Sequence, residues 1–178
     1  MKALSIKQPW ANAILSGRKT LEIRTWSTAY RGPLLICASL RPHQHPEYIA
    51  PDALTANMLR QLPKTPIGAA IGVCNLVDCR PMTEADEPQA MCQHNPPHGR
   101  QLYAFVLADV RRIEPYPIRG ALGLFDAKVQ DRPPQFWEMC KEVTKAMKVR
   151  LEKQAALCVE CGKRERKIGE LCFDCAGK

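Results

Sequence analysis

The amino-acid sequence predicts an α+β fold, a small mixed β-barrel with flanking helices. Several short stretches show the alternation, or the continuous apolar run, that is typical of β-strands. One late stretch carries apolar residues at three- to four-residue spacing, as helices do, and an early stretch has a proline and a glycine that suit the two ends of a helix. Glycine and proline separate these stretches at short intervals. Because the expected strands are close together and helices stand early and late, we expect a barrel capped by helices.

The first part of the chain alternates between strand and helix patterns. A helix is expected over residues 8–17, because Pro9 suits its first turn and Gly17 suits a left-handed cap at its end. Period-two alternation or an apolar run predicts strands over residues 3–6, 20–26 and 32–39.

An inserted helix is expected around residues 52–62, with Asp52 as its N-cap, after a loop rich in proline and histidine. Glycines inside the next strand indicate a bulge or a close backbone approach. Strands are expected over residues 67–79 and 102–114 and at the end of 116–129, with an exposed excursion over 80–101. The domain organisation is therefore a barrel domain over 1–132, a long connecting helix over 133–157 and a small module over 158–178.

The C-terminal module contains two Cys-x-x-Cys pairs separated by ten residues. Four thiolates at this spacing can close tetrahedrally around one zinc ion. Because four cysteines fill the coordination sphere, the expected zinc is structural, and its binding would supply much of the module's stability. The predicted zinc ligands are Cys158, Cys161, Cys172 and Cys175.

The composition favours a polyanionic partner. The formal net charge is +8, and clustered lysine and arginine bind phosphates with release of counterions. The sequence has no run of about 18 apolar residues, so no membrane span is expected. Its first residues lack the apolar region of a signal peptide, which predicts a cytoplasmic protein.

The strand over residues 20–26 carries an unusual set of side chains. Glu22, Arg24 and Trp26 share one face of an extended strand, and Lys19 lies just upstream. A carboxylate, a guanidinium and an amine could meet in one pocket, where the arginine would grip a phosphate and Trp26 or Trp10 would stack on a base. The alternative is a solvated ion pair between Glu22 and Arg24, with Trp26 covering the edge of the barrel.

The segment LSIKQPWANAILSGRKTLEIRTWSTAYRGPLLICAS resembles the ASCH domain, a family whose fold is similar to that of PUA domains. The family pattern is carried here by Ser5, Gln8, Pro9, Trp10, Gly17, Lys19, Glu22, Arg24, Arg31 and Gly32. The resemblance covers roughly residues 3 to 130. It implies a small PUA-like barrel, association with RNA or other nucleic acid, and a cleft lined by Lys19, Glu22 and Arg24 with Gln8 and Trp10 beside them.

Resemblance to particular ASCH proteins also raises enzymatic alternatives. Some family members are ribonucleases, which implies a metal-independent reaction with Lys19 stabilising charge and Glu22 as base. Others are amidohydrolases on N4-acetylcytidine, in which a lysine and a threonine act with a later glutamate. Lys19 matches that lysine, but Glu22 stands in place of the threonine. A third alternative is a protein-interaction module, in which the zinc module binds a protein partner.

Overall fold

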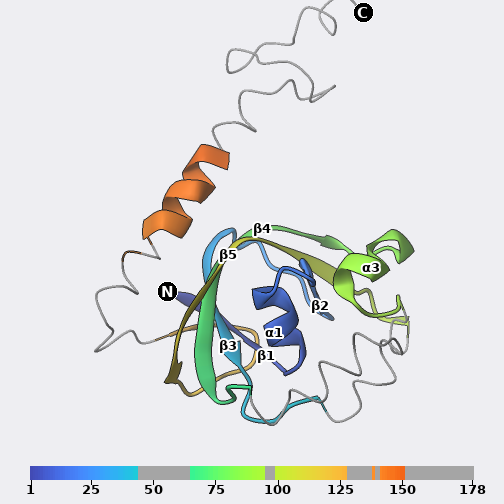
Figure 1. Cartoon of the computed structure of the whole chain (residues 1–178). Coiled ribbons are helices and arrows are strands. Elements are labelled where there is room, and N and C mark those ends of the chain that lie inside the picture. The colour runs from blue at the N-terminus through green and yellow to red at the C-terminus, as the bar shows by residue number, and fades with distance from the viewer. Residues whose placement is uncertain (44–64, 95–98, 128–137, 139–140, 151–178) are drawn as a thin grey trace, which may run out of the picture.

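The computed structural model describes residues 1–43, 65–94, 99–127, 138 and 141–150 (Figure 1). It confirms the α+β class and the order of the predicted strands. The named elements are β1 (Lys2–Ile6), α1 (Trp10–Leu15), β2 (Leu21–Arg24), β3 (Gly32–Ala38), β4 (Ala69–Pro81), η3 (Glu84–Asp86), α3 (Glu87–Ala90), β5 (Tyr103–Pro117) and β6 (Leu124–Asp126).

The strands form one mixed sheet that curls around α1 (Figure 1). Their order is β2-β5-β4-β3-β1-β6, in which β1 and β3 run parallel and every other described pair is antiparallel. The long β4–β5 pair has three register shifts, and such bulges bend a sheet. Among the described strands β2 and β6 are edges, so the predicted barrel is a half-barrel in this part of the chain.

Helix α1 fills the concave face of the sheet. Its residues Trp10, Ala11 and Ile14 are buried in a core built mainly from β1, β3, β4 and β5. Gly72 on β4 allows the close approach, because a side-chain carbon there would overlap Leu15 and lie 3.0 Å from the Arg111 carbonyl oxygen. Gly17 ends the helical segment at φ +75°, as the sequence predicts.

The opposite face of the sheet carries a second apolar core and a helix over residues 141–150 (Figure 1). Val143 is buried in this core, and the fully buried Asn75 donates a 2.8 Å hydrogen bond to its carbonyl oxygen. Asn75 also donates to Asp109, whose other carboxylate oxygen accepts from Arg150 at 3.0 Å. We call Asn75, Asp109 and Arg150 the docking node, because it fixes this helix to the sheet.

Two predicted elements lie outside the described residues: the inserted helix around 52–62 and the cysteine module over 158–178. Residues 141–150 belong to the predicted connecting helix over 133–157, most of whose remainder is also outside them. In the described part of the chain, no helix has the length and apolar character needed to span a membrane.

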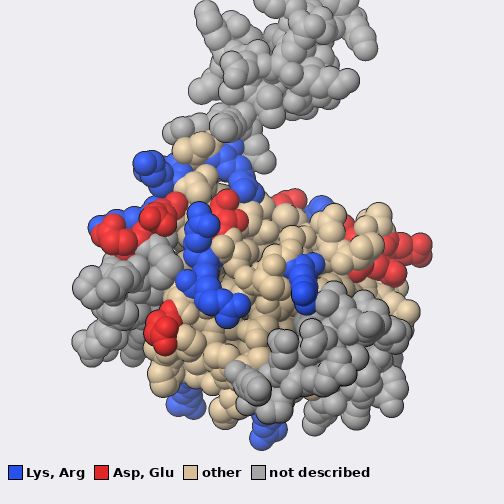
Figure 2. All heavy atoms as spheres, in the orientation of Figure 1, with Lys and Arg blue, Asp and Glu red and all other residues tan. Residues whose placement is uncertain are grey.

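Charge is unevenly spread over the described surface (Figure 2). Acidic side chains gather over the η3–α3 segment, which carries Glu84, Asp86 and Glu87. Basic side chains gather over the helix of residues 141–150, which carries Lys141, Lys145, Lys148 and Arg150.

Candidate functional site

A cavity of about 790 Å³ opens beside α1 and β2. This volume is in the range of small-molecule and cofactor sites, which is roughly 300–1,000 Å³. The walls come from segments far apart in sequence. The lining residues are Ser5, Lys7, Trp10, Lys19, Glu22, Ile23, Arg24, Trp26, Ser39, His43, Ala90, Met91, Cys92, Ala121, Leu122 and Gly123.

Lys19, Glu22 and Arg24 meet in this cavity, and we call them the cavity cluster. The Glu22 carboxylate lies 3.0 Å from Arg24 Nη2 and 3.5 Å from Lys19 Nζ. The side chains of Glu22 and Arg24 are 9% and 22% exposed, so their ion pair is largely buried rather than a solvated surface pair, and Lys19 beside them is only 5% exposed. Two cationic side chains share one carboxylate here, so the formal charge of the cluster is +1.

Further contacts hold both cations of the cavity cluster in place. Lys19 Nζ donates a hydrogen bond to the Ala90 carbonyl oxygen and lies 5.9 Å from the centre of the Trp10 ring, close enough for a cation–π contact. Arg24 Nη2 donates to the Ser5 carbonyl oxygen at 2.7 Å. These contacts hold the two cationic groups in fixed positions before a ligand binds.

Two buried polar atoms on the lining residues have no hydrogen-bond partner within the described structure: Arg24 Nε and Ser5 Oγ. Buried polar groups in proteins are nearly always satisfied, by the protein or by water. An unsatisfied donor and an unsatisfied hydroxyl therefore belong to two residues that line the cavity, and both stand directly behind its surface.

Two indole rings form apolar walls. Trp10 is 8% exposed and packs edge-on to His43, with ring centres 6.3 Å apart. Trp26 lies edge-on to Phe105 at 4.9 Å and at an interplanar angle of 89°. These contacts fix the planes of both rings, and fixed aromatic planes are the usual surfaces on which nucleobases stack.

The excursion over residues 80–101 supplies the wall opposite α1. It contains α3, whose end at Met91 adopts a left-handed conformation with φ +52°. The Gln89 carbonyl oxygen accepts a hydrogen bond from Thr20 N, which ties this wall to the start of β2. Cys92 also lines the cavity, and burial raises the pKa of its thiol, so the thiol stays protonated at neutral pH.

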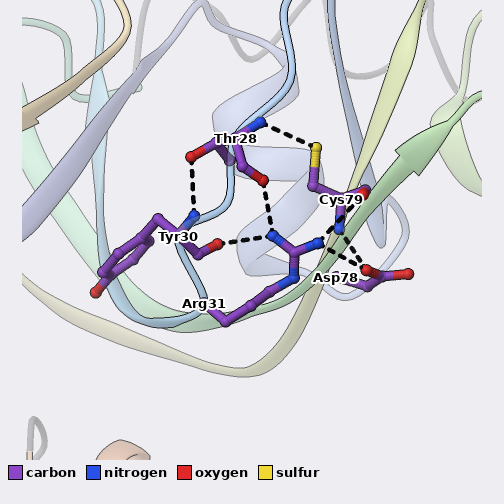
Figure 3. Close-up of polar contacts among 5 residues, drawn as sticks. All are labelled: Thr28, Tyr30, Arg31, Asp78 and Cys79. Carbon is purple, nitrogen blue, oxygen red and sulfur yellow. Dashed lines mark hydrogen bonds and ion pairs between the residues drawn. The ribbon is translucent and has the colours of Figure 1, made fainter.

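The loop between β2 and β3 is held by a separate network, drawn in Figure 3. Arg31 donates to the carbonyl oxygens of Thr28 and Tyr30 and of Cys79, and it pairs with Asp78 at 2.9 Å. We call Thr28, Tyr30, Arg31, Asp78 and Cys79 the loop anchor. It fixes the loop that follows Trp26 onto β4, and so it supports one wall of the cavity.

Five of the six predicted ligand-binding residues line the cavity: Trp10, Lys19, Glu22, Arg24 and Trp26. Gln8, the sixth, does not. Its side chain is fully buried, donates to the Pro66 carbonyl oxygen at 3.0 Å and accepts from Asn12 N at 3.1 Å. In this structure Gln8 therefore joins α1 to the segment before β4.

Other cavity residues were not expected from the sequence. His43 comes from the proline- and histidine-rich loop, and its backbone N–H donates to the Gln8 carbonyl oxygen at 2.8 Å. Ala90, Met91 and Cys92 come from the excursion that the sequence indicated only as exposed loop. Their one available signal was the apolar Ala-Met-Cys triplet within a polar stretch.

No group of three or more His, Cys, Asp or Glu side chains within the described ranges could hold a metal ion. The four cysteines predicted to bind zinc lie beyond residue 150, outside those ranges.

Comparison with known proteins identifies the family. The model of the ASCH domain matches residues 4–117. The chain is 26% identical over 159 residues to activating signal cointegrator 1 of Homo sapiens, a match that covers 85% of this chain and 24% of that protein. It is 37% identical over 82 residues to the protein of the same name from Mus musculus, covering 43% of this chain and 14% of that one.

The chain thus spans about a quarter of the length of the human relative. The crystal structure of ASCH from Zymomonas mobilis has a TM-score of 0.50 at 16% identity, covering 80% of this chain and 94% of that chain. At this identity the likeness concerns the fold alone. Because the family model matches more than half of the residues, the chain belongs to the ASCH domain family.

Proposed function

We propose that this protein binds RNA and that the cavity takes up one nucleotide of a single strand. The observation that carries the proposal is the cavity cluster, in which the buried Lys19 and the partly buried Arg24 share one carboxylate beside two fixed indole rings. A nucleotide needs these features together: a cation for its phosphate or carbonyl oxygens, and an aromatic plane for its base.

The surroundings of the cavity cluster support this proposal. Lys7 is exposed and lines the cavity, so it can meet a phosphate that remains in solvent. The net charge of +8 favours approach of a polyanion. Single-stranded RNA fits better than a duplex, because a base must be unstacked before it can enter a cavity.

A gel-shift experiment tests this function. Labelled single-stranded RNA, duplex RNA and DNA are incubated with wild type and with Lys19→Ala, and mobility and cleavage are read in the same lanes. Lys141→Ala is the matched control, since its side chain is 72% exposed on the helix across the sheet. We expect Lys19→Ala to weaken RNA binding at least tenfold and Lys141→Ala to behave as wild type. Equal affinity in wild type and Lys19→Ala would remove the cavity from the function.

A metal-independent ribonuclease is the second candidate, and His43 is the observation that favours it. Histidine can accept and donate protons at neutral pH, and His43 lines the same cavity as Lys19 and Glu22. In this candidate Glu22 takes the proton of the ribose 2′-hydroxyl, whose oxygen attacks phosphorus, and His43 gives a proton to the 5′-oxygen as the bond between that oxygen and phosphorus breaks. Cleavage that persists with a chelator and disappears in both His43→Ala and Lys19→Ala would establish it.

We also propose that residues 158–178 bind one structural zinc ion through Cys158, Cys161, Cys172 and Cys175. The support is their doubled Cys-x-x-Cys spacing. Elemental analysis of the native protein should give one zinc per chain, and Cys161→Ser should lose it. Metal-free native protein would contradict the proposal. A protein partner bound through this module is compatible with RNA binding by the cavity.

A further inference from the structure

The loop of residues 118–123 joins β5 to β6 and forms part of the mouth of the cavity, and we call it the rim loop. Ala121, Leu122 and Gly123 line the cavity from this side. Leu122 is 98% exposed, the highest value among the large apolar residues of the described chain. Its side chain therefore gains almost nothing from packing within the protein.

The rim loop is anchored rather than left as a loose tip. Ile118 N donates to the Gly68 carbonyl oxygen at 3.0 Å, and β6 pairs with β1 directly after the loop. Gly120 lies so close to β1 that a side-chain carbon there would be 2.6 Å from Ser5 Oγ. Gly123 turns the chain back at φ +67°, a conformation that glycine adopts without strain.

Single exposed leucines are common on protein surfaces, so exposure alone has no functional meaning. Leu122 differs by its place. It lies on the rim of a cavity that holds a buried charge cluster, and the exposed Lys7 lines the same cavity. A nucleotide that enters the cavity brings its chain neighbour to this rim, because consecutive nucleotides are covalently joined.

We propose that Leu122 packs against the base of the nucleotide next to the one in the cavity, so that the site contacts two nucleotides. This inference rests on the proposed RNA binding. The face of a nucleobase is apolar enough to cover a leucine side chain, and every base has such a face. The contact therefore adds affinity without selecting one base.

A thermodynamic cycle tests this contact. Mononucleotides and the dinucleotides ApA, CpC, GpG and UpU, each with a terminal phosphate, compete against labelled single-stranded RNA on wild type and on Leu122→Ala. Matching dinucleotides that lack one base at either position complete the cycle. Leu40→Ala is the matched control, since Leu40 is 72% exposed and does not line the cavity.

We expect wild type to bind the best dinucleotide about tenfold more tightly than its mononucleotide. Leu122→Ala should lose most of this gain, Leu122→Phe should keep it, and Leu40→Ala should match wild type. Removing the base that contacts Leu122 should abolish the difference in affinity between wild type and Leu122→Ala, whereas removing the base that enters the cavity should weaken both proteins alike. Thermal melting shows that each variant is folded.

The outcomes separate the two proposals. If wild type binds no labelled RNA, the proposed function fails and the rim contact fails with it. If wild type binds RNA but Leu122→Ala keeps the full gain from mononucleotide to dinucleotide, only the rim contact is wrong. An equal loss in Leu40→Ala would likewise overturn it, because the effect would then come from surface apolarity in general.

Discussion

Arg24 and Arg31 stand seven positions apart and belong to two ion-pair networks of different character. In the loop anchor, Arg31 binds three carbonyl oxygens and one carboxylate, all within the protein. In the cavity cluster, Arg24 binds one carboxylate and one carbonyl oxygen, and its buried Nε has no partner. The contacts of the Arg31 guanidinium all stabilise the fold, whereas the Arg24 guanidinium has one N–H group without a partner.

The difference shows how one motif can carry both structure and function. Both arginines fit the ASCH pattern in the sequence, where nothing distinguishes their roles. Their surroundings do so, because the Arg31 contacts all lie within the protein, whereas Arg24 lines the cavity and has one nitrogen without a partner. Four substitutions test this distinction.

Arg31→Ala should have the largest effect, and it should be on stability. The substitution removes the Arg31 hydrogen bonds to three carbonyl oxygens and its ion pair with Asp78, so the free energy of unfolding should fall by about 3 kcal/mol. Urea denaturation measures this, with the exposed Arg41→Ala as the matched control. A loss below about 1 kcal/mol would show that the loop anchor contributes little to the fold.

Arg24→Ala should instead act on binding. Truncation of a partly buried guanidinium that contacts a ligand costs about 2 kcal/mol, which is roughly a thirtyfold rise in the Kd for single-stranded RNA. The free energy of unfolding should fall by only about 1 kcal/mol, because Lys19 still pairs with the Glu22 carboxylate in this variant. Fluorescence anisotropy and urea denaturation on the same sample separate the two effects. If Arg24→Ala loses as much stability as Arg31→Ala and keeps its RNA affinity, Arg24 has a structural role like that of Arg31 and no role in binding.

Asp86 and Arg80 form a third ion-pair network. Its contribution to the free energy of unfolding can be tested by varying the pH. Hydrogen bonds from Arg80 first, and from Thr83, hold the pKa of the Asp86 carboxyl well below its usual range. The stabilisation is therefore present above the unfolded-state pKa near 4 and is lost as the pH falls towards the folded-state value.

Asp86→Asn should lower the free energy of unfolding at pH 7 by about 1–2 kcal/mol, a modest value because the Arg80 side chain is 41% exposed. The gap between wild type and variant should narrow from about pH 5 to pH 2. Denaturation curves across this range give the result, and a constant gap would mean that the ionised carboxylate is not what stabilises the fold.

Cys79→Ala should have the smallest effect. Cys79 Sγ accepts a hydrogen bond from Thr28 N at 3.4 Å, and sulfur is a weak acceptor. The free energy of unfolding should fall by about 0.5–1 kcal/mol. A fall in the free energy of unfolding as large as that of Arg31→Ala would show that the Cys79 thiol, rather than the Arg31 guanidinium, contributes most of the stability of the loop anchor.

Local patterns predicted the strands well, because alternation and apolar runs report which residues face a core. The cap at Gly17 and the close approach at Gly72 also follow from the sequence, since only glycine suits these places. The extent of barrel closure could not be predicted from the sequence: a barrel was expected, and the described strands form an open half-barrel. The bulges between β4 and β5 that curl the sheet depend on pairing between strands, which no single strand encodes.

The candidate site divides in the same way. Glu22, Arg24 and Trp26 could be grouped because a strand places alternate residues on one face. The opposite side of the cavity could not be foreseen, because Ala90, Met91 and Cys92, which line it together with them, lie more than sixty residues further along the chain. His43 and Leu122 reach the same cavity from two loops, and loop paths are set by contacts that local sequence does not show.

The docking node fixes the position of Arg150 relative to the sheet. Since Arg150 is bound to Asp109, it is held on the sheet face opposite the cavity. A group attached at a fixed point has its highest effective concentration on that side of the protein. The helix of residues 141–150 would therefore concentrate anything bound to it on the face away from the cavity, and Asp109→Ala should loosen this attachment.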